Sequence, residues 1–276
     1  MPEGPEIRRA ADELDRALRG HTVRRVFFSF DHLKPFAPIL AGHCIEAVTA
    51  RGKAILTRFD HDWIIYSHNQ LYGRWMVSAD ETPPQTSRRL RLALHTDRAS
   101  AWLFSASEIT VLETRDLARH PYLARLGPEL LDPAMEVSTV LARLGEPRFS
   151  RRCLMSLLQD QSVLAGMGNY LCCEVLHGSG LHPQQRIAEL SAQQRRTLAS
   201  HCLRLTRQSY RTGGITNQLT RARTLRAQGA SFEDSRFLVY RRGGLPCYTC
   251  GTPVLRDRFC GRTAYLCPTC QPAAQR

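Results

Sequence analysis

A chain of 276 residues is long enough for two or three small domains, each with a modest hydrophobic core. Its 38 basic residues against 25 acidic ones give a net charge of +13, which favours a polyanionic partner such as nucleic acid, although a basic protein without a specific partner is the alternative. No apolar run is long enough to span a bilayer, and the N-terminus lacks the apolar core of a signal peptide. We therefore expect a soluble, cytoplasmic protein without a membrane partner.

The chain opens with Met-Pro-Glu-Gly-Pro-Glu at residues 1–6. If Met1 is removed, Pro2 carries a free secondary amine, and an α-amine with a pKa of about 8 is far less protonated at neutral pH than a lysine. Such an amine condenses with an aldehyde to a cationic iminium, which promotes elimination at the neighbouring carbon. Glu3 is then placed to shuttle protons. The alternative is that Pro and Glu are simply favoured in a first helical turn.

The first half of the chain carries helical and then strand signals. Over residues 5–20, apolar residues recur at helical spacing opposite a charged face, which predicts one amphipathic helix. Short runs rich in β-branched and aromatic residues follow up to about Glu113, and their close spacing predicts an antiparallel sandwich. The predicted strands are residues 26–30, 45–49, 54–59, 63–67, 74–78, 90–96 and 101–104.

Two positions between these strands suit contacts with a nucleic acid. Lys34 and Lys53 are the only lysines of this arginine-rich chain, and Lys53 follows a turn-like Arg-Gly pair. Two interpretations of Lys53 remain: it contacts a phosphate, or it is a solvated lysine at the end of a strand. The triplet Gln70-Leu71-Tyr72 combines polar, apolar and aromatic side chains of the kind that wedge into a base stack. Its alternative is a simple continuation of strand and turn.

The middle of the chain predicts helices. Gly-Pro and Asp-Pro pairs within residues 116–149 mark a domain boundary, with a short helical pattern at residues 137–144. Further helices are predicted before and after a Gly-rich turn at residues 165–169, and a helix start there exposes N–H groups that suit a phosphate next to Asn169. Another helix is predicted at residues 191–209, and the Gly/Arg-rich residues 211–229 are predicted to be a loop.

The C-terminal segment has the most specific spacing of the sequence. Two Cys-x-x-Cys pairs, Cys247 with Cys250 and Cys267 with Cys270, predict one tetrahedral, structural Zn²⁺ held on a hairpin. Arg262 is expected at the hairpin tip, where it can reach a duplex, although it is otherwise one more surface arginine. The remaining six cysteines show no disulfide framework, which favours a reducing compartment.

These signals together predict an α+β multidomain chain. Residues 1–132 form an N-terminal helix plus antiparallel β-sandwich domain, residues 133–235 a helical helix-two-turns-helix domain, and residues 236–276 a Cys₄ zinc-finger hairpin. The opening Pro-Glu, the sandwich, the Gly-Asn turn between helices and the terminal cysteines stand in the order found in the formamidopyrimidine-DNA glycosylase and endonuclease VIII family. The chain resembles that family over essentially its whole length.

The resemblance implies a bifunctional DNA glycosylase and AP lyase of base excision repair, acting on damaged double-stranded DNA. Pro2 matches the nucleophile that attacks the sugar C1′ of a flipped nucleotide, Glu3 its acid/base partner, and Lys53 the family's essential strand lysine near the phosphate and the sugar. The resulting iminium drives β,δ-elimination without a catalytic cofactor. Retention of Met1 would turn the Pro2 nitrogen into an amide and abolish this chemistry.

The resemblance also implies the DNA-binding residues. Asn169 and Arg262 match the pair that grips the lesion-site phosphate, Gln70-Leu71-Tyr72 matches the loop that fills the void left by the flipped base, and Glu6 matches a second N-terminal acid. The triplet and the opening residues favour the endonuclease VIII branch, and with it an oxidised pyrimidine as substrate. We further expect a monomer that works on the nucleoid in the bacterial cytoplasm.

Three other functions remain open at this point. An oxidised-purine glycosylase uses the same fold, and residues 211–229 are longer than expected for endonuclease VIII, which leaves the breadth of substrates open. A non-catalytic damaged-DNA-binding protein would have no need of Pro2, Glu3 and Lys53. An RNA-binding zinc ribbon has the charge but does not explain the N-terminus.

Overall fold

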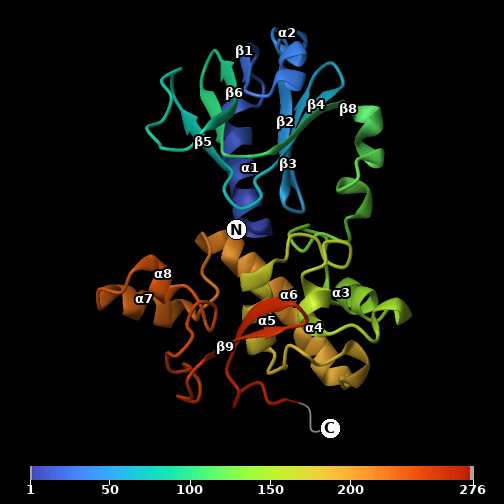
Figure 1. The fold of residues 1–276 in the computed structure, drawn as a ribbon, viewed down its shortest axis with the longest axis vertical. Coiled ribbons are helices and arrows are strands. Elements are labelled where there is room, and N and C mark those ends of the chain that lie inside the picture. Colours follow the sequence, from blue (N-terminus) through green and yellow to red (C-terminus); the bar gives the residue numbers. More distant parts are fainter. Residues whose placement is uncertain (1, 274–276) are drawn as a thin grey trace. The chain divides into compact units, whose positions relative to one another are not determined.

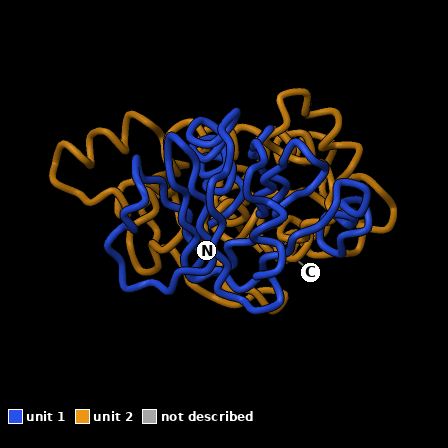
Figure 2. Tube along the Cα trace, turned by 90° about the horizontal axis from the view of Figure 1, so that it is seen from above, with its two compact units in different colours: residues 1–125 blue, residues 126–276 orange. Residues whose placement is uncertain are grey.

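The computed structural model describes residues 2–273 of the chain. These residues form two compact units, Met1–Arg125 (unit 1) and Leu126–Arg276 (unit 2), which are coloured separately in Figure 2. The expectation about removal of Met1 concerns a residue outside the described part. Among residues 2–273, no helix has both the length and the apolar character needed to cross a bilayer.

Unit 1 begins with the amphipathic helix α1 (Gly4–Leu18). Glu3 is its N-cap and forms a capping box with Glu6, which explains why the helix starts directly after the N-terminal residues. Its apolar face is buried, through Ile7, Ala11, Leu14 and Leu18, and packs against strand β2 (Ile45–Arg51). The predicted helix is therefore present.

Two four-stranded antiparallel sheets complete the predicted sandwich (Figure 1). One sheet has the order β1-β6-β7-β5 and the other the order β2-β3-β4-β8. The strands not yet given are β1 (Val23–Phe28), β3 (Ala54–Phe59), β4 (Trp63–His68), β5 (Arg74–Ser78), β6 (Leu90–Thr96), β7 (Ser100–Phe104) and β8 (Glu108–Glu113). Strand β8 is absent from the predicted strands. The short helices η1 (Asp31–Phe36) and α2 (Ala37–Leu40) follow β1, and η2 (Thr114–Arg119) and η3 (Leu123–Arg125) follow β8.

Unit 2 is helical and ends in a two-stranded hairpin. The helix α5 (Asn169–Gly178) runs through its core, with residues 170–177 all buried. Around it lie α3 (Val137–Leu144), η4 (Pro147–Phe149), α4 (Leu154–Leu158), η5 (Ile187–Glu189) and α6 (Ala192–Thr212). The antiparallel strands β9 (Leu255–Phe259) and β10 (Arg262–Leu266) form the hairpin, and β10 contacts α4 and α5.

The predicted loop at residues 211–229 is wrong in its main part. Helix α6 continues to Thr212 and is capped by Gly213 at φ +74°, and α7 (Leu219–Ala227) then forms, followed by α8 (Phe232–Ser235). The glycines of this segment lie at helix ends, where a left-handed conformation is needed, while the arginines between them are good helix formers. The pair α7 and α8 lies at one edge of unit 2 (Figure 1).

Unit 2 contains a disulfide, whereas no disulfide framework was expected from the sequence. Cys153, the N-cap of α4, is joined by a disulfide to Cys260 in the turn between β9 and β10. The two residues are 107 positions apart, so no local spacing reveals the pair.

Candidate functional site

The N-terminal end of α1 holds the first group of candidate residues. Pro2 is half-buried, and Glu3 beside it is only 3% exposed. The backbone N–H of Glu3 donates a hydrogen bond to the Glu6 carboxylate over 3.0 Å, so Glu6 holds the first helical turn in place. The positive end of the helix dipole stabilises a carboxylate at this position. A buried carboxyl group at this end of a helix is suited to proton transfer.

Lys53 lies in the tight connection between β2 and β3. Gly52 adopts a left-handed φ of +60° there, which lets the chain reverse, and Lys53 is 9% exposed. Its backbone N–H donates to the hydroxyl of Tyr122 over 2.9 Å. Lysines are rarely this buried in proteins, so the position of Lys53 is unusual for a solvated strand-end residue.

His68, at the end of β4, belongs to the surroundings of Lys53. Burial holds the pKa of His68 below its usual value, the charge of Lys53 lowers it further, and the carboxylate of Glu108 opposes both effects. The ring is therefore neutral at pH 7, and its Nδ1 accepts a hydrogen bond from the backbone N–H of Gln70 over 3.0 Å. Sequence reasoning missed His68 and Glu108, because they are brought together only by the pairing of β4 with β8.

The triplet Gln70-Leu71-Tyr72 forms the turn between β4 and β5. The turn is closed by a 2.7 Å hydrogen bond from the N–H of Gly73 to the carbonyl of Asn69, and a Cβ added to Gly73 would lie 2.5 Å from that carbonyl oxygen. Leu71 is 54% and Tyr72 69% exposed. A narrow, closed turn thus presents an apolar and an aromatic side chain to solvent, which is the arrangement expected of a wedge.

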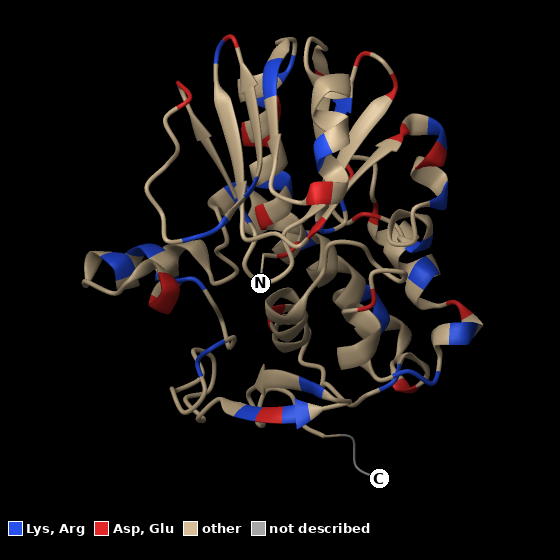
Figure 3. Ribbon diagram, turned by 45° about the horizontal axis from the view of Figure 1, so that its top comes forward, with Lys and Arg blue, Asp and Glu red and all other residues tan. Residues whose placement is uncertain are grey.

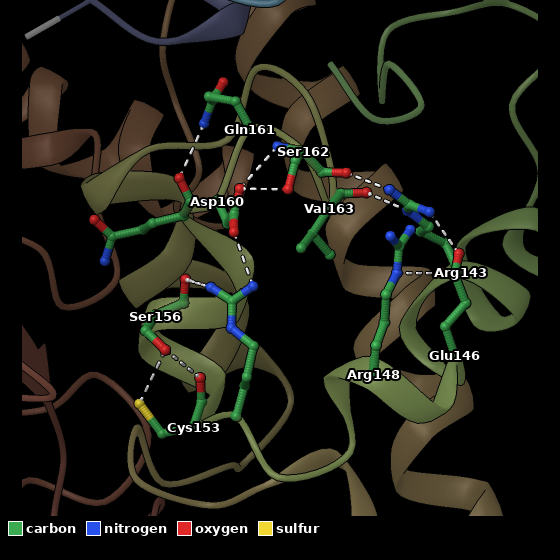
Figure 4. A network of polar contacts seen from close by, with 11 residues as sticks. Arg143, Glu146, Arg148, Cys153, Ser156, Asp160, Gln161, Ser162 and Val163 are labelled. Atoms are coloured by element: carbon green, nitrogen blue, oxygen red, sulfur yellow. Dashed lines mark hydrogen bonds and ion pairs between the residues drawn. The ribbon is translucent and has the colours of Figure 1, made fainter. Parts of the chain in front are cut away.

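In unit 2, a network of polar contacts supports the turn that leads to Asn169 (Figure 4). Asp160 accepts hydrogen bonds from Arg152 and from the backbone and side chain of Ser162. The side-chain amide of Gln161 donates to the Met167 carbonyl over 2.7 Å and accepts from the N–H of Gly166 over 3.0 Å. The two hydrogen bonds of Gln161 therefore fix the backbone of Gly166 and Met167, just before α5.

Asn169 is the first residue of α5. Its Oδ1 is buried and has no hydrogen-bond partner among residues 2–273. An unsatisfied buried polar atom is rare in proteins, and here it lies at a helix N-terminus, where N–H groups and the helix dipole favour anions. An amide oxygen only accepts hydrogen bonds, so a phosphate here would be bound by the N–H groups at the start of α5 and by Nδ2 of Asn169. That Asn169 binds a phosphate stays a prediction.

The four patterned cysteines of unit 2 meet in space. Their sulfur atoms all lie within 4.8 Å of one another, and individual Sγ–Sγ distances are 3.9 Å for Cys247 and Cys270, 3.4 Å for Cys250 and Cys267, and 3.6 Å for Cys250 and Cys270. A tetrahedral zinc with Zn–S bonds of about 2.3 Å requires sulfur–sulfur edges of about 3.8 Å. The donor set therefore fits a zinc ion, and it leaves no position for a substrate.

Arg262 is the first residue of β10 and is exposed. The preceding two-residue turn consists of Cys260 and Gly261, both with positive φ (+51° and +77°), as in a tight hairpin turn. The colouring of the ribbon in Figure 3 shows basic residues along this hairpin and on α7. The predicted location of Arg262 at the hairpin tip is the observed one.

Comparisons with known proteins bear on what these groups do together. Two family models match the chain: the formamidopyrimidine-DNA glycosylase N-terminal domain over residues 1–119 and the formamidopyrimidine-DNA glycosylase H2TH domain over residues 126–221. The chain is 44% identical to Endonuclease 8 of Pectobacterium atrosepticum and 43% identical to Endonuclease 8 of Escherichia coli strain K12. Both matches extend over 271 residues, 98% of this chain and 100% of each relative.

Solved structures share the fold. The structure of Lactococcus lactis Fpg (MutM) in complex with DNA containing N7-benzyl-Fapy-dG has a TM-score of 0.81 and 19% identity, covering 99% of this chain and 100% of that one. The complex of Lactococcus lactis Fpg with DNA containing an abasic site also has a TM-score of 0.81 and 19% identity, over 98% of this chain and 100% of that one.

Proposed function

The chain belongs to the formamidopyrimidine-DNA glycosylase and endonuclease VIII family, and on this premise we propose that it is a bifunctional DNA glycosylase and AP lyase that excises oxidised pyrimidines. The observation that carries the proposal is the 44% identity to an Endonuclease 8 over 98% of the chain, with Pro2 and a buried Glu3 at its start.

In this proposal, the chemistry belongs to the N-terminal end of unit 1. The amine of Pro2, freed by removal of Met1, attacks C1′ of a flipped nucleotide, and the base leaves with the electrons of the glycosidic bond. The nitrogen lone pair then expels the ring oxygen O4′, which takes up a proton, and the resulting cationic iminium acidifies the C2′ hydrogens. Loss of a C2′ proton expels the 3′ phosphate, and a second elimination expels the 5′ phosphate. Glu3, held by the Glu6 capping box, takes and returns the protons.

We count Lys53 and Arg262 with the catalytic residues and assign the other candidates to DNA binding. Lys53 acts near the phosphate and the sugar, and the Gln70-Leu71-Tyr72 turn fills the gap left by the flipped nucleotide, for which extrusion costs a few kcal/mol. Asn169 and Arg262 bind the lesion-site phosphate. The position of Asn169 at the N-terminus of α5, where N–H groups favour an anion, and the exposed position of Arg262 support this assignment.

We also propose that the four cysteines hold one structural zinc ion. Such an ion contributes folding energy to a segment with little core of its own and fixes the hairpin that carries Arg262. The division into a catalytic part (residues 1–132), a helix-two-turns-helix part (residues 133–235) and a zinc finger (residues 236–276) belongs to the same proposal. So does a monomer acting on the nucleoid in the bacterial cytoplasm.

Borohydride trapping tests the proposed function, because borohydride reduces an iminium to a stable amine and leaves protein covalently bound to DNA. Purified protein, shown by mass spectrometry to lack Met1, is mixed with labelled duplexes carrying thymine glycol, an oxidised guanine or an abasic site. Strong trapping on thymine glycol is expected, and Pro2→Gly, which replaces the secondary amine of proline by the primary amine of glycine, should greatly reduce it.

A matched control is Pro83→Gly, the same substitution in an exposed loop, which should trap as the unmodified chain does. Preference for oxidised guanine would replace the proposed substrate by an oxidised purine. Absence of trapping on the abasic duplex, with DNA binding intact, would leave a non-catalytic DNA-binding protein.

A further inference from the structure

The side-chain amide of Gln70 is held at both of its ends. Its Nε2 donates to Oε2 of Glu108 over 3.2 Å, and its Oε1 accepts a hydrogen bond from the hydroxyl of Ser107. An ionised carboxylate only accepts hydrogen bonds, so the amide nitrogen must face Glu108 and the amide oxygen must face Ser107. The orientation of the Gln70 amide is thereby determined by its two partners.

Glu108 is itself fixed in place. Its other carboxylate oxygen, Oε1, accepts from the hydroxyl of Tyr66 over 2.9 Å, and Tyr66 is fully buried. Burial and the bond to Glu108 raise the pKa of Tyr66 far above its usual value, so the hydroxyl remains a donor. Glu108 also stands opposite His68 in the antiparallel pairing of β8 with β4. One carboxylate thus connects a buried tyrosine to the turn.

The backbone of Gln70 is held as well. Its φ of +50° is a left-handed conformation that is unfavourable for a non-glycine residue, and its N–H donates to His68 Nδ1. By contrast, Leu71 and Tyr72 are the exposed members of the triplet. Without DNA, the side chain and backbone of Gln70 are therefore held by hydrogen bonds, whereas the side chains of Leu71 and Tyr72 are exposed to solvent.

We propose that Glu108 and Ser107 are positioning residues that set the Gln70 amide before DNA arrives. When the turn contacts the duplex, Leu71 and Tyr72 can insert into the gap left by the flipped nucleotide, and the side-chain amide of Gln70 is already oriented. Ordering a glutamine side chain on binding reduces affinity, and an enzyme that orders it beforehand avoids this loss. This inference rests on the proposed function, in which the triplet fills the gap in the duplex.

Glu108→Gln is the informative variant because it preserves size. The new amide oxygen can still accept from Tyr66, but the new NH₂ group then faces the NH₂ group of Gln70, donor against donor. The exchange Gln70→Glu with Glu108→Gln restores a donor facing an acceptor and keeps the net charge. Glu113→Gln is the matched control, since Glu113 lies on the same strand and pairs with Arg115 away from the turn. Ser107→Ala removes the second contact alone.

The first readout is hydrogen–deuterium exchange of the peptide covering residues 66–74 in DNA-free protein. Glu108→Gln should exchange several-fold faster there, and the double exchange variant should return to the original rate. Equal exchange in the original protein and in Glu108→Gln would overturn the proposal, as would an equal effect of Glu113→Gln. Ser107→Ala should give a smaller acceleration, and it decides the matter if Glu108→Gln fails to fold.

The second readout is insertion into DNA without chemistry, measured with a duplex that carries a tetrahydrofuran abasic analogue opposite 2-aminopurine. Loss of one preset hydrogen bond should weaken binding roughly five-fold and slow the fluorescence change. Single-turnover cleavage of a true abasic site at saturating protein should stay within about two-fold, since Pro2 and Glu3 are untouched. Equal or tighter binding by Glu108→Gln would show that Glu108 restrains the turn, and would overturn the proposal.

Failure of the proposed function is distinguishable from failure of this inference. If the unmodified protein traps no abasic DNA, the glycosylase and lyase assignment falls, whereas the exchange measurement on DNA-free protein still decides whether Glu108 and Ser107 hold Gln70.

Discussion

The carboxylate of Glu174 in unit 2 is surrounded by hydrogen-bond donors. It is fully buried in α5 and accepts hydrogen bonds from the backbone N–H groups of Leu238, Val239 and Tyr240 over 2.7, 2.8 and 2.9 Å, and from the hydroxyl of Thr216. Burial raises the pKa of Glu174, while these four donors favour its ionised form. The carboxylate therefore links α5 by hydrogen bonds to two other segments, the one before α7 and the one before the four patterned cysteines.

Removal of this carboxylate should be costly, because four buried donors lose their acceptor. We predict that Glu174→Ala lowers the free energy of unfolding by about 3–5 kcal/mol, measured by urea denaturation followed by circular dichroism. The exposed Glu136 supplies the control, since Glu136→Ala should cost less than about 1 kcal/mol. A cost of Glu174→Ala as small as that of the control would mean that water replaces the carboxylate.

At the scale of elements, the proposed zinc ion would stabilise the hairpin of β9 and β10. Cys250→Ser removes one of four thiolates, and we predict that the zinc content, measured by atomic emission on dialysed protein, falls from one ion per chain to well below one. Because the hairpin carries Arg262, cleavage of damaged DNA should fall by about a hundred-fold or more. Cys44→Ser, a substitution in unit 1, should change neither quantity. Full zinc content in Cys250→Ser would rule out the four-cysteine site.

The elements that could be predicted from the sequence are those with a local pattern. Three patterns are of this kind: the amphipathic face of α1, the runs of β-branched and aromatic residues in β2 to β7, and the Cys-x-x-Cys pairs. In each, the residues that form the pattern are close together along the chain. Helix α7 was missed because the glycines that cap its neighbours resemble a loop composition. Strand β8 was missed although Ile109 and Val111 alternate with polar residues, a signal that could have identified it.

Contacts between distant parts of the chain could not be predicted in the same way. Glu108 and Gln70 are 38 positions apart, and their hydrogen bond depends on the register of β4 with β8 and on the left-handed turn at Gln70. Likewise, the four donors of Glu174 come from segments 42 to 66 positions away. The chemistry of the candidate residues was visible in the sequence, whereas the residues that hold them in place became visible only in the fold.

At the scale of the whole molecule, both units bury neutral histidines. Burial lowers the pKa of His95 and His120 in unit 1 and of His182 and His201 in unit 2 below the usual value of 6.5. In the unfolded chain these groups bind protons near pH 6.5, whereas in the folded chain they bind them only at lower pH. The unfolded state therefore holds more protons just below pH 6.5, and stability must rise with pH in that window.

We predict that the unfolding temperature falls as the pH is lowered from 7.5 to 5.5 and changes little above pH 7.5. This window lies above the range in which the acids with lowered pKa values, such as Asp60 and Asp160, become protonated. The raised pKa of Glu174 acts in the opposite sense, but the four histidines outnumber it. His95→Gln keeps a partner for Ser100 but cannot titrate, and it should flatten the pH dependence, whereas His32→Gln, at an exposed position, should not. Stability that increases toward pH 5.5 would contradict this prediction, because it would require these histidines to bind protons more readily in the folded protein than in the unfolded chain.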